Sequence, residues 1–489
     1  MPDMATIDEQ NKQSSGSLNQ SDGTKTSGSR LRRLVSFFFS PHTLFLILAI
    51  PFGVVFTFFV PPFQVPDENL HFYRAYQISE GHFVPQTQGR LMGGWAPVSV
   101  VELQKKFVDM RWAAQGKTNP PEIASHLKTP LHPEKKVFVS EAVIACYSPV
   151  PYAATSLVFW VGRGFDCSAL QLMYLGRLAN LAAWCMLVFL AIRWLPAGKW
   201  LFMLLALTPM SLYEAASLSA DCLTNALAFL TIAAFLRLYA SDSVISFRRL
   251  IGVFFLLIAM SLCKNIFFIF TGLFFLLRSR QFGGRGRYWL IFGLLLFANL
   301  AAVGYWAYQF NGTPINWNGT ADPAQQAQYI LSAPLNYAAV LLNTFSVNQG
   351  FQPFSIRWIG TFVGWFGWTE VFLGRWHFWQ WLALLLLVGL TDGSPKIKLN
   401  GGRKTLLLIL WMMGVLLTIT AVYCTWNPVG ADEVKGLQGR YWIPFSPLFF
   451  LLFYTRRCGT ARWWTGPLLT ACTAVSLIMA LWCIGIRFY

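Results

Sequence analysis

Long apolar runs separated by short polar loops dominate the chain. Three of these runs, at residues 45–60, 406–423 and 467–486, approach the roughly 20 residues that span the core of a bilayer. Backbone groups in lipid must be hydrogen-bonded within their own segment, so we expect these runs to be helices. A membrane β-barrel would alternate apolar and polar residues, which these runs do not. The pattern therefore predicts an all-α polytopic membrane protein.

Basic residues between the runs predict the topology. SRLRR at 29–33 precedes the first run, which predicts a cytoplasmic N-terminus because short cytoplasmic loops are enriched in Lys and Arg. The apolar stretch 149–165 is ambiguous. If it lies on the outer surface, the later basic loops, including those near 196, 280 and 398, all fall on the cytoplasmic side. If it crosses, they all invert. The first alternative predicts about eleven transmembrane helices.

The same pattern divides the chain into a tail and a membrane domain. Residues 1–34 contain almost nothing to bury, which predicts a disordered cytoplasmic tail. Residues 35–489 form the predicted membrane domain. Within it, 61–168 is a large first extracytoplasmic loop with surface-lying helices, and 310–375 is a second extracytoplasmic segment.

Composition excludes a soluble protein. The chain is 55% apolar and only 12% charged, against about 25% charged residues in soluble domains. The net charge of +17 lies mostly in short loops, so it indicates topology and contact with anionic membrane lipids rather than nucleic acid. The nine cysteines are scattered singly, and this supports neither a zinc site nor a disulfide framework.

Polar residues first interrupt the apolar pattern just after the first run. Asp67 and Glu68 follow Val60 closely, and His71 and Arg74 come next at helical spacing. We include His71 and Arg74 among the predicted substrate-binding residues. An acid beside the membrane surface suits a general base that acts on a lipid-linked substrate. Alternatively, the two acids simply begin a helix, where negative charge favours the helix dipole.

Three further charged residues lie near predicted outer helix ends. Asp221 is either a site residue or a helix N-cap. Lys264 and Arg440 are on the side that should avoid positive charge, so they either bind a phosphate or extend toward lipid headgroups. Gln438 and Tyr441 are close to Arg440 in the chain, and we include them among the predicted substrate-binding residues.

Tryptophan is frequent in the second outer segment, notably in GWFGWTE at 364–370. An aromatic belt at the membrane interface explains such residues without any function. Stacking on a sugar ring is the alternative, and both interpretations stay open at this point.

Several segments resemble a known family. PPFQVPDENLHFYRAYQISEG, YSPVPYAATSL, GRLANL, LTPMSLYEAASLSADCLTNALA, the Lys264 segment and LQGRYWIPFSPL resemble, in the same order, segments of domain of unknown function 2142. That family consists of uncharacterised bacterial polytopic membrane proteins. The resemblance covers most of 45–455.

The layout of that family in turn resembles the GT-C glycosyltransferases. Those enzymes have many spans, a large first outer loop and an acidic motif after the first span, and they use polyprenyl-phosphate-linked sugars. Asp67-Glu68 matches the place of that motif but lacks the D-x-D spacing of the metal-dependent members. We therefore predict no metal and no other cofactor, although the motif does not exclude a divalent metal.

The resemblance implies a membrane glycosyltransferase at the outer face of a bacterial inner membrane. It would move a sugar from a polyprenyl-phosphate donor to a cell-envelope glycan or lipid acceptor. Asp67 would be the base, with Glu68 orienting or replacing it. Arg440 and Lys264 would stabilise the leaving phosphate, and Asp221 would hold a sugar hydroxyl.

Two other functions remain open. A transporter or flippase of lipid-linked glycans would need charged residues along the spans, where we expect Asp and Glu to be nearly absent. A polysaccharide polymerase or ligase would more often carry its large loop late in the chain.

Overall fold

The computed structural model describes residues 38–310, 321–346, 348–349, 352–456 and 465–489, except 90 and 114. The predicted disordered tail at 1–34 lies outside the described residues. So do 311–320 of the second outer segment and the basic residues Arg457 and Arg462.

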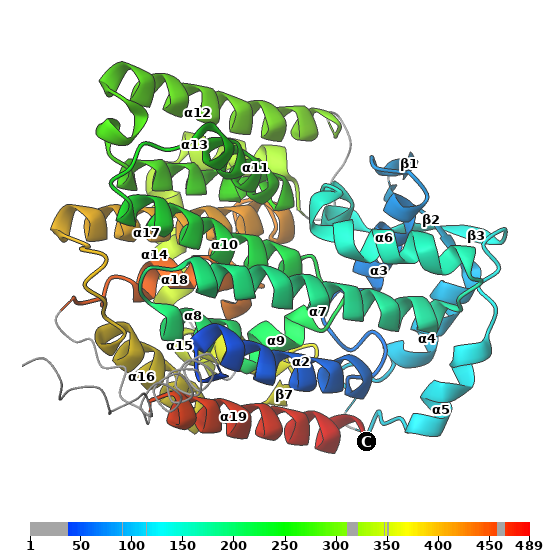
Figure 1. The fold of residues 1–489 in the computed structure, drawn as a ribbon. Coiled ribbons are helices and arrows are strands. Elements are labelled where there is room, and N and C mark those ends of the chain that lie inside the picture. Colours follow the sequence, from blue (N-terminus) through cyan, green and yellow to red (C-terminus); the bar gives the residue numbers. More distant parts are fainter. Residues whose placement is uncertain are drawn as a thin grey trace, which may run out of the picture.

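Six helices of the described chain are long and apolar enough to cross a membrane. They are α2 (Pro41–Phe59), α7 (Ala169–Trp194), α10 (Asp221–Ala240), α12 (Arg285–Tyr308), α17 (Gly401–Trp426) and α19 (Thr465–Phe488). These helices run roughly along one common direction (Figure 1). The prediction of a helical, multi-pass membrane protein is confirmed.

The other predicted spans are shorter or broken. They comprise α8 (Lys199–Ala206), α9 (Pro209–Ala215), α11 (Phe247–Cys263), the 3₁₀ helix η4 (Asn265–Leu276), α16 (Arg375–Thr391), the 3₁₀ helix η6 (Gly439–Phe445) and α18 (Ser446–Phe450). Pro209 begins α9 and Pro444 lies inside η6. Irregular backbone at membrane depth is tolerated where protein covers it. The count of about eleven spans therefore stays a prediction.

The loops that carry the basic residues were predicted to lie on one side of the membrane, and they meet at one end of the helices. We call this end the basic end. Asp242, after α10, pairs with Arg278 at 2.5 Å and also with Arg280. The Tyr239 hydroxyl donates to the Lys398 carbonyl at 2.5 Å. The loops after α10, η4 and α16 therefore share one end, as the predicted alternation requires.

The opposite end, which we call the loop end, carries the segment after α2. It contains α3 (Glu68–Ser79), α4 (Val98–Val108), α5 (Pro120–Ser125), α6 (Ala153–Gly164) and the 3₁₀ helices η1 (His126–Lys128), η2 (Ala142–Cys146) and η3 (Val150–Tyr152). An antiparallel sheet, in the order β1-β2-β3, joins β1 (Gln86–Gln88), β2 (Leu91–Pro97) and β3 (Lys136–Ser140), with Gly93 opposite Ser140. The sequence predicted helices here but not this sheet.

The ambiguous stretch 149–165 contains η3 and α6. Helix α6 has 12 residues, about 18 Å at 1.5 Å per residue, which is too short to cross a hydrocarbon core of roughly 30 Å. The chain reverses after Gly164, and α6 packs against the beginning of α7. The two helices run antiparallel, with Thr155 hydrogen-bonded to Asn180 and Gly162 beside Leu172, and the surface-lying position of 149–165 stays a prediction.

The second predicted outer segment contributes small elements. They are α13 (Pro323–Ser332), α14 (Pro334–Ser346), α15 (Phe354–Val363), and the strand pairs β4 (Asn348–Gln349) with β5 (Gln352–Pro353) and β6 (Trp365–Phe366) with β7 (Val371–Phe372). A short 3₁₀ helix, η5 (Ser279–Phe282), lies outside this segment, at the basic end.

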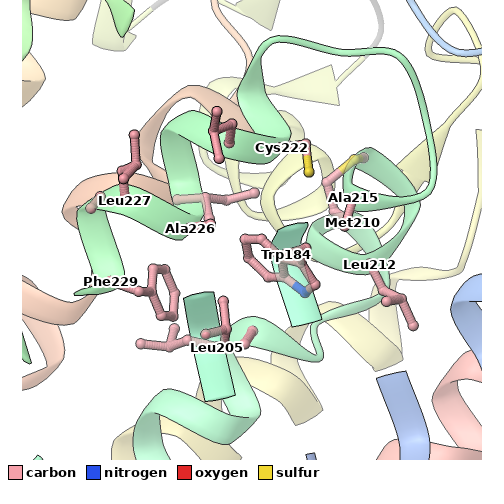
Figure 2. Packing of buried hydrophobic residues seen from close by; sticks show 14 of the residues in the cluster. Trp184, Leu205, Met210, Leu212, Ala215, Cys222, Ala226, Leu227 and Phe229 are labelled. Carbon is pink, nitrogen blue, oxygen red and sulfur yellow. The ribbon is translucent and has the colours of Figure 1, made fainter. Parts of the chain in front are cut away.

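The core that supports the site lies where α7, α8, α9 and α10 meet. Trp184 of α7 faces Phe229 of α10 with ring centroids 5.9 Å apart. Leu205 of α8 and Met210 of α9 pack around the same indole (Figure 2). This apolar packing fixes the broken span α8–α9 against α10, and both α9 and α10 carry acidic residues at the loop end.

Candidate functional site

Helix α3 is polar in sequence yet buried over most of its length. Buried polar groups need hydrogen-bond partners, and α3 finds them in neighbouring elements. His71 Nδ1 lies 2.8 Å from the Tyr152 hydroxyl. Arg74 donates to the carbonyls of Tyr147 and Phe83, at 3.1 and 2.5 Å. Burial lowers the pKa of His71 to about 3, so its imidazole is neutral.

Glu68 pairs with a residue that the sequence did not single out. Its carboxylate accepts two hydrogen bonds from Arg177 of α7, at 2.7 and 2.6 Å, and both side chains are fully buried. Arg177 also donates to the carbonyls of Thr57 and Val60, each at 2.8 Å. The pair therefore ties the end of α2 to the start of α3. The catalytic role predicted for Glu68 and the substrate-binding role predicted for Arg74 stay untested, while both side chains contact protein groups.

Asp67, the residue before Glu68, has different surroundings. It occupies the N-cap position of α3 in the left-handed conformation, with φ of 60°, and its side chain makes no capping hydrogen bond. Left-handed backbone at a non-glycine residue is strained and often marks functional positions. The Asp67 side chain is 31% exposed. Its carboxylate therefore does not cap the helix and is open to a ligand.

Arg440 lies at the centre of the acidic residues. Its guanidinium is 2.9 Å from Glu214, 3.7 Å from Asp221 and 4.0 Å from Asp67. The Gln438 side chain accepts a hydrogen bond from Arg440 Nε at 2.8 Å. Arg440 is only 5% exposed, so it does not extend into the lipid headgroups.

The segment that carries Arg440 is held by α15. A Cβ on Gly439 would lie 1.9 Å from the Trp358 carbonyl oxygen, so only glycine allows this approach of η6 to α15. The Gly439 amide also donates to the Thr361 hydroxyl at 2.6 Å. These contacts fix the guanidinium next to the start of α10.

Lys264 completes the group. It lies between α11 and η4, at the point where the α-helix ends and the 3₁₀ helix begins. Its ammonium is 2.5 Å from Asp221 and lies over the rings of Tyr147 and Tyr441, 5.5 and 5.9 Å from their centroids. Asp221 is the first residue of α10, whose N-cap is Ala220. Asp221 thus pairs with a cation from another helix, and the N-cap interpretation is wrong.

The structure brings together six of the predicted site residues. We call these six residues together with Glu214 the charged cluster. The six are Asp67, Asp221, Lys264, Gln438, Arg440 and Tyr441. All seven lie at helix starts, at helix breaks or in short helices of the loop end. Backbone of this kind allows side chains from distant segments to converge.

Sequence reasoning missed Glu214 and Arg177. Glu214 is 1% exposed and lies in α9, within a segment expected to be nearly free of acids. Arg177 lies well inside the apolar helix α7. A charged residue inside a predicted span is itself a signal of function or of a buried partner. This signal would have identified both residues.

The cluster combines acids with cations at close range. Burial raises the pKa of the Asp67 carboxyl, while the nearby Arg440 charge opposes that rise. Asp67 is therefore a stronger base than an ordinary aspartate and can accept a proton. Arg440 and Lys264 can stabilise an anion. Among the described residues, no three His, Cys, Asp or Glu side chains group as metal ligands.

Comparison with known proteins gives one match. Residues 50–449 match the family model described as "Predicted membrane protein (DUF2142)". No curated protein matches the chain. No solved structure matches it either. The matched residues include the whole charged cluster and make up most of the chain, which therefore belongs to the DUF2142 family of predicted membrane proteins.

Proposed function

We propose that this protein is a membrane glycosyltransferase of GT-C-like layout that uses a polyprenyl-phosphate-linked sugar. The single observation that carries the proposal is the pairing of Asp67 with Arg440. Asp67 has a strained backbone, and its accessible carboxylate does not cap the helix and lies 4.0 Å from the buried Arg440 guanidinium. Metal-dependent chemistry is less well supported, because among the described residues no three His, Cys, Asp or Glu side chains group as metal ligands.

The reaction follows from the charges. Asp67 takes the proton of an acceptor hydroxyl, and the oxygen attacks C1 of the donor sugar. The bond between C1 and the phosphate oxygen breaks, and the electron pair leaves with polyprenyl phosphate. Arg440 and Lys264 stabilise the negative charge that develops on this phosphate. Asp221 orients Lys264 through their ion pair and holds a hydroxyl of the sugar.

The membrane arrangement belongs to the same proposal. About eleven segments cross a bacterial inner membrane, with the N-terminus in the cytoplasm and the loop end outside. The grouping of Asp242, Arg278 and Arg280 at the basic end supports this orientation. The cluster then lies at the depth where a lipid-linked phosphate meets water, and the acceptor is a cell-envelope glycan or a lipid.

A direct assay tests the proposal. Purified protein in lipid nanodiscs is incubated with a panel of polyprenyl-phosphate sugars, and release of polyprenyl phosphate is measured. We expect release from at least one donor and its loss in Asp67→Asn. Release that is equal in wild type and Asp67→Asn would remove Asp67 from the mechanism, and absence of release from every donor would contradict the transferase proposal.

A transporter of lipid-linked glycans is the second candidate, and Glu214 favours it. A buried acid 2.9 Å from Arg440 in a broken span resembles the charged groups of proton-coupled transporters. Reconstituted vesicles with a fluorescent lipid-linked sugar separate the two functions. Movement across the bilayer without release of polyprenyl phosphate would favour the transporter.

A further inference from the structure

Arg111, Trp112 and Trp368 form a group at the loop end that the proposed reaction does not use. We call it the tryptophan platform. Arg111 and Trp112 follow α4, and Trp368 lies in the hairpin between β6 and β7. The two indole rings meet edge to face, with centroids 5.7 Å apart, and the Arg111 guanidinium lies 4.4 Å from the Trp368 ring centroid.

Hydrogen bonds hold Trp112 in an outward position. Its indole N–H donates to the Trp368 carbonyl at 3.1 Å, and its backbone N–H donates to the Glu370 carboxylate at 3.0 Å. Glu370 is paired in turn with Arg487 at 2.7 Å. Trp112 has a φ of 58°, a strained value that persists only where the surroundings enforce it. Even so, 69% of Trp112 stays exposed.

Two contacts join the platform to the turn that carries Asp67. The Tyr213 hydroxyl donates to the Gln64 carbonyl at 3.1 Å and accepts from the Gly367 amide, also at 3.1 Å. The Gln64 side chain donates to the Phe107 carbonyl at 2.8 Å, near the end of α4. Both halves of the platform are thus tied to the residues just before Asp67.

Electrostatics supports the same placement. Arg111 lowers the pKa of the Asp67 carboxyl and the Asp67 charge raises that of Arg111, although burial is the larger effect on each group. Lys264 belongs instead to the wall formed by α11 and η4. Asp67 thus contacts Arg440 of the cluster, 4.0 Å away, and its charge also interacts with Arg111 of the platform.

We propose that the tryptophan platform binds a sugar ring of the acceptor glycan. This rests on the proposed function, because it gives the acceptor a place beside the base. A pyranose ring has an apolar C–H face and a rim of hydroxyls. The exposed Trp112 indole suits the face, and Arg111 and Asp67 suit the hydroxyls, the usual combination of aromatic and polar groups in a binding site. A lipid chain suits this position less, because a guanidinium and carboxylates flank the rings.

Binding of neutral trisaccharides tests the platform. Maltotriose, cellotriose and mannotriose are titrated against full-length protein in nanodiscs by saturation-transfer NMR. The variants are Trp112→Ala, Trp112→Phe and, as a matched control, Trp376→Ala, because Trp376 is 87% exposed at the start of α16. We expect wild type to bind at least one trisaccharide, and Trp112→Ala to weaken that binding about tenfold, as the loss of a central aromatic contact does.

The controls separate stacking from other roles. Trp112→Phe loses the indole N–H but keeps a ring, so it should bind better than Trp112→Ala. Equal binding losses in both variants would reduce Trp112 to a structural role and overturn the proposal. An equal loss in Trp376→Ala would indicate an interfacial aromatic belt only, and absence of binding to wild type would also overturn the proposal.

The same preparation distinguishes this inference from the transferase itself. If wild type binds a trisaccharide through Trp112 but releases no polyprenyl phosphate from any donor, the platform stands and the transferase proposal fails. If wild type releases polyprenyl phosphate but Trp112→Ala binds sugars normally, the transferase proposal stands and the platform fails.

Discussion

Asp67 and Glu68 are neighbours in the chain, but their carboxylates lie in opposite kinds of environment. Glu68 is fully buried and accepts two hydrogen bonds from Arg177, whereas Asp67 is 31% exposed and 4.0 Å from Arg440. The turn at Asp67 directs one acid into the protein and the other toward the charged cluster. The two neighbouring acids therefore differ in role: Glu68 holds the end of α2 to the start of α3 through Arg177, and Asp67 is the candidate base.

Asp67→Asn should abolish activity without loss of stability. A missing general base costs about 10² to 10⁴ in rate. Asn tolerates the left-handed backbone, and because the pKa of Asp67 is raised in the folded protein, the ionised carboxylate weakens folding at neutral pH. Release of polyprenyl phosphate and the melting temperature in detergent measure the two effects. A clear fall in melting temperature would contradict the accessible, non-capping role.

Glu68→Gln should act mainly on stability. It leaves the Arg177 charge buried without its partner, which typically costs about 3–5 kcal/mol. The measurements are folded yield and melting temperature beside those of Asp67→Asn. Normal stability combined with lost turnover in Glu68→Gln would instead give Glu68 the catalytic role proposed for Asp67.

Arg440→Lys should impair turnover although the charge is kept. Lys lacks the planar fork with which Arg440 reaches Glu214 and Gln438 together. Donor turnover is compared at matched expression with Arg237→Lys, a change in the last turn of α10 at the basic end. A fully active Arg440→Lys protein would discard the phosphate role and leave Lys264 as the remaining cationic candidate.

Glu141 should make the loop end less stable as pH rises. The side chain is fully buried with one hydrogen bond from Gln77, and burial raises its pKa to about 8. The folded state therefore keeps a proton that the unfolded chain releases at its ordinary pKa of about 4.3. The free energy of unfolding falls between these two pKa values and is lowest above pH 8. Glu141→Gln should raise the melting temperature at pH 8.5 and leave it nearly unchanged at pH 4, and an unchanged value at both would contradict the burial of a titrating acid.

Cysteine labelling should place the two ends of the molecule on opposite sides of the membrane. Lys135 is exposed at the loop end, and the Arg280 side chain is 61% exposed at the basic end. In a background with the native cysteines replaced, Lys135→Cys should react with an impermeant maleimide in intact cells, and Arg280→Cys only after permeabilisation. Labelling of position 280 from outside would contradict the proposed topology.

Local chemistry alone predicted most of the architecture. Apolar runs must become helices in lipid, so α2, α7, α10, α12, α17 and α19 could be expected from the sequence. The basic loops indicated which helix ends lie together, and the pairing of Asp242 with Arg278 agrees with that grouping. The three-stranded sheet was not predicted, because its strands are short and β1–β2 pairs with the distant β3.

For the site, the sequence by itself determined which residue types stand out against the apolar background, and Asp67, Asp221, Lys264 and Arg440 were found in this way. Only the tertiary structure decided which of them meet, that Glu68 belongs to Arg177, and that Glu214 joins the cluster. The physical reason is that hydropathy depends on the composition of each segment. Ion pairs such as Arg440 with Glu214, 226 residues apart in the chain, depend on how broken helices from distant segments pack against each other.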